Sequence, residues 1–75
     1  MPPIKRVSGR QLVRALERLG WRVDRIRGSH HIMRHDQSRT TLAVPVHANT
    51  TLPIGTQLSI LKDAEVDAVE FNELV

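Results

Sequence analysis

The stretch WRVDRIRGSHHIMRH, residues 21–35, decides the fold because it encodes two strands joined by a glycine turn. Residues 21–26 alternate between apolar and polar side chains, which is typical of a strand with one buried face, and Trp21 is expected to point inward. A tight turn at Gly28 leads into a second strand over residues 30–35. The sequence therefore predicts a β-hairpin whose turn is followed by two adjacent histidines.

The segment before this hairpin predicts a helix over residues 9–19. Ser8, followed three residues later by Gln11, has the pattern of a capping box, which begins helices. Leucine and alanine then recur at intervals of three and four residues, which places them on one face. Gly20 supplies the C-terminal stop.

Downstream of the hairpin, the sequence predicts a third strand and two helices. Residues 40–46 are rich in β-branched side chains, and Pro45 near their end favours an edge position or the end of a strand. A loop over residues 47–55 precedes a helix that Thr56 is expected to cap. Asp67 is expected to begin a third, short helix.

The resulting order is α-β-β-β-α with a short C-terminal helix. Helices packed on one face of an antiparallel sheet form an α+β two-layer sandwich, an order shared with double-stranded-RNA-binding domains. We expect a single domain over residues 1–75. Its core should contain the two large aromatic residues and the apolar face of the second helix: Trp21, Phe71, Leu58, Ile60, Leu61 and Ala64.

Composition excludes several classes of site. Cysteine is absent, so the chain holds no disulfide, thiolate metal site or cysteine nucleophile. The first six residues lack the apolar run of a secretory signal, and no apolar stretch approaches the roughly 18 residues of a membrane span. We therefore expect a soluble, cytoplasmic protein that does not bind a membrane.

Charge is unevenly distributed along the chain. Residues 1–39 hold ten of the eleven Lys and Arg residues against three acids, a net charge of +7, whereas residues 40–75 hold one lysine against five acids, a net charge of −4. Nine of the ten cations are arginine, whose guanidinium suits bidentate phosphate contacts. With both aromatics expected in the core, we expect RNA to be bound through phosphate and 2′-hydroxyl contacts.

The hairpin combines these cations with histidine, which accepts and donates protons near neutral pH. Cleavage of RNA without a metal needs the 2′-hydroxyl deprotonated, the leaving 5′-oxygen protonated and positive charge beside the phosphorus. A histidine of the pair at positions 30 and 31 is a candidate for the proton transfers. The phosphate would be held by three arginines, and Ser29 would either cap the turn or orient a phosphate: Arg25, Arg27 and Arg34.

The two neighbouring histidines are expected to differ in surroundings. Adjacent residues of a strand project to opposite faces, so one histidine should face solvent and the other should pack towards the helices. His35 and His47 are expected to be turn and loop residues, either of which could lie near the site in space. Zinc is not expected, because His31 and His35 would lie about 13 Å apart along a strand. The sequence suggests neither a metal nor any other cofactor.

Five short motifs make the chain similar to the HicA toxins. They follow one another in the family's order over about residues 8–66, and they are Leu19–Trp21, Arg27–Ile32, Val44–His47, Leu52–Thr56 and Ser59–Ala64. The resemblance implies a double-stranded-RNA-binding-like fold and an mRNA interferase, an endoribonuclease that arrests translation and growth. It also implies a HicB-type antitoxin that masks the active site. Direct binding to DNA is not expected.

The resemblance also assigns the histidine. In the family, the functional histidine follows the glycine by two positions, which corresponds to His30 here; His31 is the alternative. The acidic segment 65–75 departs from the family pattern and is assigned no role.

Two other functions fit part of the sequence. A non-catalytic double-stranded-RNA-binding module would share the fold, but its last helix usually begins with a lysine cluster, and here only Lys62 is present, between acids. A pure interaction protein would use its arginines to bind an acidic partner. Cleavage that depends on His30 separates the toxin from both.

Overall fold

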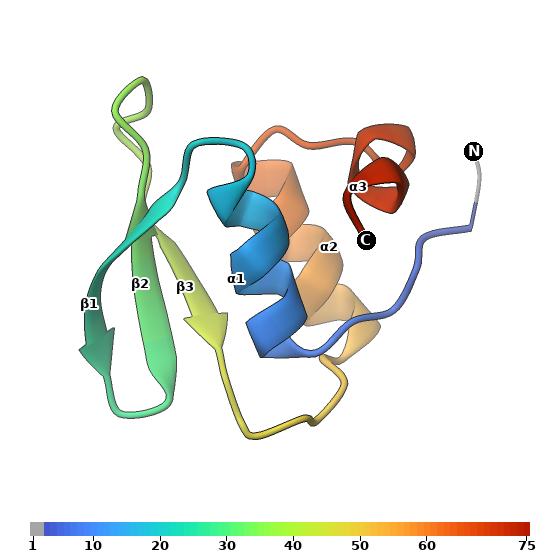
Figure 1. Ribbon diagram of the computed structural model, residues 1–75, viewed down its shortest axis with the longest axis horizontal. Helices are drawn as coiled ribbons and strands as arrows, with labels where there is room; N and C mark the ends of the chain where they lie inside the picture. The colour runs from blue at the N-terminus through green and yellow to red at the C-terminus, as the bar shows by residue number, and fades with distance from the viewer. Residues whose placement is uncertain (1–2) are drawn as a thin grey trace.

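The computed structural model describes residues 3–75, so the first two residues of the expected domain lie outside the described residues. A three-stranded sheet forms one layer and the helices lie on one side of it (Figure 1). This confirms the predicted α+β arrangement. The elements, in chain order, are α1 (Gly9–Glu17), β1 (Arg22–Arg27), β2 (His30–Arg34), β3 (Leu42–Pro45), α2 (Ile54–Asp63) and α3 (Ala68–Leu74).

The sheet is antiparallel with strand order β1-β2-β3, so β2 is central and Pro45 lies on an edge strand, as predicted. Met33 of β2 pairs with Leu42 of β3, and both are buried beneath the helices. The opposite face of the sheet has no helix over it in the part of the chain that the structure describes (Figure 1). That uncovered face is where side chains are free to meet a large ligand.

Helix α1 begins as its sequence predicts. The Ser8 side chain accepts from the Gln11 N–H, and the Gln11 side chain accepts from the Ser8 N–H, which completes the capping box. The regular helix ends at Glu17, two residues before the predicted end, and a turn continues to Gly20, whose φ is 95°. The left-handed backbone there suits glycine and stops the helix.

The start of α1 packs directly on the end of β3. A Cβ atom added to Gly9 would lie 1.8 Å from the carbonyl oxygen of Pro45. Only glycine therefore permits this approach of the two backbones, which fixes α1 against the sheet near the His30 end of β2.

Helix α2 differs from its prediction at its start. It begins at Ile54, with Pro53 at the N-cap, and Thr56 lies inside the first turn instead of capping it. No side chain caps this helix. The prediction of a Thr56 cap was wrong because Pro53, with φ −55° and an extended ψ of 140°, already sets the entry of the chain.

The buried face of α2 also differs from expectation. Ile60 and Leu61 are buried as predicted, but Leu58 is 48% exposed and Gln57 is fully buried. Gln57 is tolerated there because its amide is satisfied: Oε1 accepts from the Val7 N–H at 3.2 Å, and Nε2 donates to the Lys5 carbonyl at 2.7 Å.

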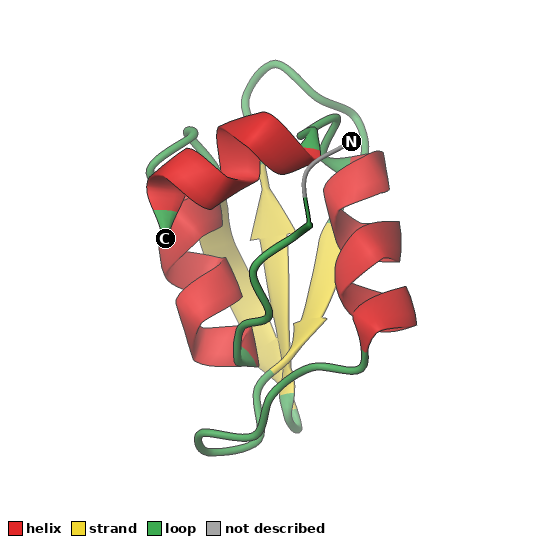
Figure 2. Ribbon diagram, turned by 90° about the vertical axis from the view of Figure 1, so that its right-hand side faces the viewer, coloured by secondary structure: helices red, strands yellow, loops and turns green. Residues whose placement is uncertain are grey.

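The N-terminal segment, residues 3–8, runs between α1 and α2 on the side away from the sheet (Figure 2). Helix α3 crosses near the upper end of this segment in that view. Asp67 caps α3 as predicted, accepting from the Glu70 N–H at 2.8 Å. Phe71 is fully buried and Trp21 is 6% exposed, which confirms both aromatics as core residues. No helix within residues 3–75 combines the length and apolarity needed to cross a membrane.

Candidate active site

The uncovered face of the sheet brings four predicted site residues together. Arg27 pairs with His30 across β1 and β2, and Arg25 pairs with Ile32. Directly opposed residues of an antiparallel pair point to the same face, and so do residues two apart on one strand. His30, Arg25, Arg27 and Arg34 therefore share the face that no helix covers, and all four are exposed.

A β-bulge at Asp24 turns the arginines of β1 towards this face. The register shifts between Val23 and Arg25, so one residue of β1 has no partner on β2. Val23 points to the helix side, and strict alternation would send Arg25 and Arg27 to that side as well. The additional residue reverses the alternation and places both arginines beside the His30 strand. No residue of this segment predicts the bulge from the sequence.

Arg22 lies on the same face but is not a free cation. Its guanidinium donates a hydrogen bond to the Asp36 carboxylate and forms an ion pair with it, and this contact lowers the pKa of Asp36. Arg25, Arg27 and Arg34 form no such pair with any residue from 3 to 75. Their charges are therefore available to a phosphate.

The turn before His30 holds this end of the hairpin in place. Gly28 adopts a φ of 58°, which suits glycine. The Ser29 carbonyl accepts from the Val46 N–H at 2.7 Å, which ties the turn to the residue after β3. Within residues 3–75 the Ser29 hydroxyl makes no hydrogen bond, so no capping bond by this side chain is seen.

His31 points to the opposite face, as strand alternation predicts. It lines a hollow of about 190 Å³ between β2 and α1, together with two arginines of the helix, Arg10 and Arg14, and the carboxylate of Glu17. Its Nδ1 is buried and has no hydrogen-bond partner among the described residues. One histidine is thus exposed and the other is partly covered by α1.

Of the remaining histidines, His35 lies at the opposite end of β2 from His30, whereas His47 follows β3 two residues after Pro45, the partner of His30. His35 Nε2 lies 3.0 Å from the Leu19 carbonyl, and His35 Nδ1 accepts from the Gln37 N–H at 3.0 Å. Its ring packs edge-on against Trp21, with centroids 5.2 Å apart. His35 therefore holds the β2–β3 turn against the turn that follows α1, and His47 is exposed in a loop.

Residues 9–66 of the 75-residue chain match the family described as the HicA toxin of bacterial toxin-antitoxin systems. The chain belongs to the HicA toxin family. No curated protein matches the chain significantly.

As a HicA toxin, the protein acts in a pair with an antitoxin. The family match contains the whole sheet and both candidate histidines, whereas α3 lies outside it. The uncovered arginine face thus lies within the matched residues.

Proposed function

We propose that this HicA toxin is a metal-independent endoribonuclease that cleaves mRNA, with His30 as its general acid–base residue. The observation that carries the proposal is the juxtaposition of His30 with three uncompensated arginines on the uncovered sheet face. That face lies within the region that matches the HicA family. Arginine at this spacing is suited to hold consecutive phosphates of a single strand.

The proposed reaction transfers one proton through the histidine. His30 accepts the proton of a 2′-hydroxyl, and the 2′-oxygen attacks the adjacent phosphorus. The bond from phosphorus to the 5′-oxygen breaks, and the protonated histidine donates its proton to the departing oxygen. The products are a 2′,3′-cyclic phosphate and a free 5′-hydroxyl. Acid–base catalysis of this kind contributes about 10²–10⁴-fold.

The arginines supply charge to the transition state. Arg27, directly opposite His30, is the residue best placed to contact the phosphorane oxygens. Arg25 and Arg34 lie further along the same face and are suited to the flanking phosphates. Since both large aromatics are buried, base stacking contributes little, and cleavage should show modest sequence preference.

His31 is the second candidate for the catalytic role. Its Nδ1 is buried without a partner, while the hollow beside it contains Arg10 and Arg14, so an RNA phosphate in that hollow would meet two cations and an imidazole. The two histidines point to opposite faces of the sheet and therefore do not act on one phosphate.

The antitoxin is proposed to be of the HicB type and to neutralise the toxin by masking the uncovered arginine face. An acidic surface would satisfy these guanidinium groups and exclude RNA at the same time. The side chains of this face are not part of the core, so either RNA or the antitoxin can contact them without disturbing the fold.

Induced expression in a bacterial host tests the proposal. Wild-type toxin should arrest growth with loss of mRNA, and His30→Ala should abolish both effects. His47→Ala, which removes an exposed loop histidine, is the matched control and should remain toxic. Rescue by His31→Ala alone would move the catalytic role to the α1 side of the sheet. Harmless expression of soluble wild-type protein would favour a non-catalytic RNA-binding module.

A further inference from the structure

An apolar side chain is exposed at the free edge of the sheet, on the side of the helices. β1 is an edge strand, and Ile26 pairs with His31 of β2, so the two side chains are neighbours on one face. Ile26 is 58% exposed, more than any other large apolar residue within residues 3–75. Helix α1 therefore leaves this part of β1 uncovered, and an apolar surface lies open beside His31.

The hollow of about 190 Å³ between α1 and β2 adjoins this surface. Its apolar lining consists of Val13, which is buried, and Val46, which is half-buried. Its charged lining consists of Arg10, Arg14 and Glu17, and none of the three takes part in an ion pair within residues 3–75. Two guanidinium groups against one carboxylate give the hollow a net positive charge.

The imidazole of His31 adds a further hydrogen-bond donor to the hollow. Its Nδ1 is buried and has no partner among residues 3–75, whereas its Nε2 is not buried. A buried N–H without an acceptor costs free energy, so the neutral ring carries its proton on Nε2. Three side chains of the hollow therefore offer donors, and a ligand that fits it must supply acceptors.

A carboxylate next to an apolar side chain fits both features. The carboxylate would accept hydrogen bonds from Arg10, Arg14 and the Nε2 of His31, and guanidinium groups bind such a group in a bidentate manner. The apolar side chain would cover Ile26 and remove its surface from water. RNA supplies phosphate oxygens for the hollow, but its sugar–phosphate backbone offers Ile26 little apolar surface. The combination favours a protein over a nucleic acid.

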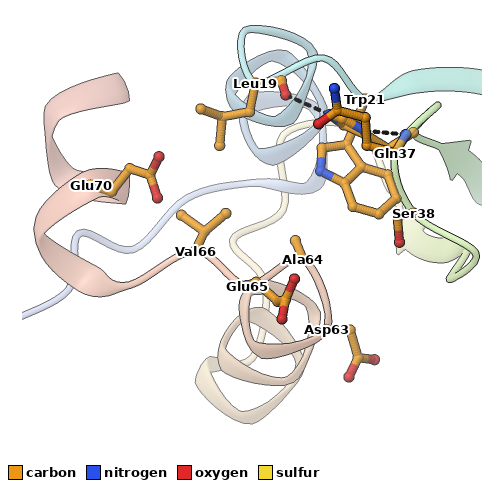
Figure 3. A pocket seen from close by; sticks show the side chains of 10 residues that line it. Leu19, Trp21, Gln37, Ser38, Asp63, Ala64, Glu65, Val66 and Glu70 are labelled. Carbon is orange, nitrogen blue, oxygen red and sulfur yellow. Dashed lines mark hydrogen bonds between the residues drawn. The ribbon is translucent and has the colours of Figure 1, made fainter.

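A second copy of the chain would also supply carboxylates. Figure 3 shows Asp63, Glu65 and Glu70 around another hollow, which residues of the β2–β3 turn also line. These acids lie at the end of β2 away from His31, so two copies would meet head to tail. Such a contact repeats without closing unless its rotation forms a ring, and a two-fold contact would instead place arginine against arginine. A different, acidic protein therefore fits the surface better.

We propose that a segment of the antitoxin docks here, with a carboxylate in the α1–β2 hollow and an apolar side chain on Ile26. The inference rests on the toxin–antitoxin pairing of the HicA family and deepens the proposed masking of the active site; it does not depend on RNA cleavage. Ile26 and Arg27 are adjacent in β1 and point to opposite faces. A partner held on Ile26 therefore reaches Arg27 and His30 by crossing one edge strand.

A blocked peptide, acetyl-Glu-Leu-Asp-Leu-Glu-amide, tests the surface by itself. We would titrate it into the full-length toxin and follow the backbone amide NMR signal of His31, which should shift saturably. The peptide with glutamine and asparagine in place of its acids has the same shape without the charge and should give no saturable shift. Ile26→Thr should weaken peptide binding at least fivefold. Ile54→Thr, the same change at an isoleucine of α2 that is 39% exposed, should not alter it.

The purified antitoxin identifies the occupant. Ile26→Thr and Arg10→Gln should each raise the dissociation constant of the toxin–antitoxin complex at least tenfold. The matched controls, Ile54→Thr and Arg39→Gln, should leave it unchanged. Free Ile26→Thr toxin should cleave RNA as wild type does, because Ile26 faces away from the proposed active site. Its melting temperature should stay close to that of wild type, since the side chain is exposed and threonine is also β-branched.

Four results would overturn the inference. They are an equal shift with the uncharged peptide, an unchanged antitoxin affinity in Ile26→Thr and Arg10→Gln, self-association of the toxin that Ile26→Thr abolishes, and binding of a single-stranded 2′-deoxy oligonucleotide that both variants weaken. The third result would assign the surface to a second copy, and the fourth would assign it to nucleic acid. A toxin that failed to cleave RNA but showed the predicted losses of antitoxin affinity would contradict the proposed ribonuclease and support the docking surface.

Discussion

Arg27 of β1 and His30 of β2 are direct partners in the sheet, and both side chains lie on the face that no described helix covers. The pairing depends on the bulge at Asp24, which reverses the alternation of β1. A flat basic surface with one titratable imidazole results.

Removing the imidazole of His30 should affect activity and not folding. His30 is exposed and makes no side-chain hydrogen bond within residues 3–75, so His30→Ala should keep the circular dichroism spectrum and melt within about 2 °C of wild type. Cleavage of RNA should fall by about 10²–10⁴-fold. His47→Ala should change neither quantity. An unfolded His30→Ala protein would give His30 a structural role and remove it from the reaction.

Neutralising Arg27 should weaken RNA binding and its dependence on salt. Each phosphate contact with a single strand contributes about 0.7 to the slope of log affinity against log salt concentration. Arg27→Gln should therefore reduce the magnitude of this slope by about 0.7, as measured by fluorescence anisotropy with a labelled single-stranded RNA. Arg39→Gln, which alters an exposed arginine in the β2–β3 turn, should leave the slope unchanged. Equal slopes for wild type and Arg27→Gln would place the phosphate elsewhere.

Adding a methyl group at Gly9 should destabilise the fold, since its Cβ would lie 1.8 Å from the Pro45 carbonyl oxygen. Separating α1 from β3 should cost about 1–3 kcal/mol of unfolding free energy, as measured by urea denaturation. Gly55→Ala is the matched control. No atom lies within 4 Å of its added Cβ, and alanine is the better helix former, so stability should rise by about 0.5–1 kcal/mol. An unchanged unfolding free energy in Gly9→Ala would show that α1 and β3 can move apart at little cost.

The buried amide of Gln57 should be costly to remove. Gln57→Leu leaves the Val7 N–H and the Lys5 carbonyl without their partners, and an unsatisfied buried group costs about 1–3 kcal/mol. Urea denaturation should show this loss. Gln37→Leu, which replaces an exposed glutamine, should change stability by less than about 0.5 kcal/mol. Equal stability of the two variants would show that the N-terminal segment contributes little to the fold.

Local sequence signals predicted most of the architecture. The capping box at Ser8, the stop at Gly20 and the Asp67 cap each use a side-chain or backbone preference that acts over a few residues, and all three are present. The opposite orientations of His30 and His31 follow from strand alternation in the same way. These features do not depend on contacts between distant parts of the chain.

Features that depend on distant contacts were missed. Glutamine is a polar residue, so the sequence predicts Gln57 on the surface. In the structure the N-terminal segment packs against α2, and the Gln57 amide is hydrogen-bonded to the backbone of Val7 and Lys5. The bulge at Asp24 has no glycine to signal it, and it appears only in the pairing of β1 with β2. For the same reason, the sequence predicted the site arginines without the reversal that places Arg25 and Arg27 beside His30.

The most direct test of the proposed ribonuclease is cleavage of a 5′-labelled RNA by purified toxin in the presence of EDTA. The account predicts cleavage that leaves 2′,3′-cyclic phosphate ends, is weakened by salt and is lost in His30→Ala. Cleavage that requires added magnesium or zinc, or that persists in His30→Ala, would contradict it.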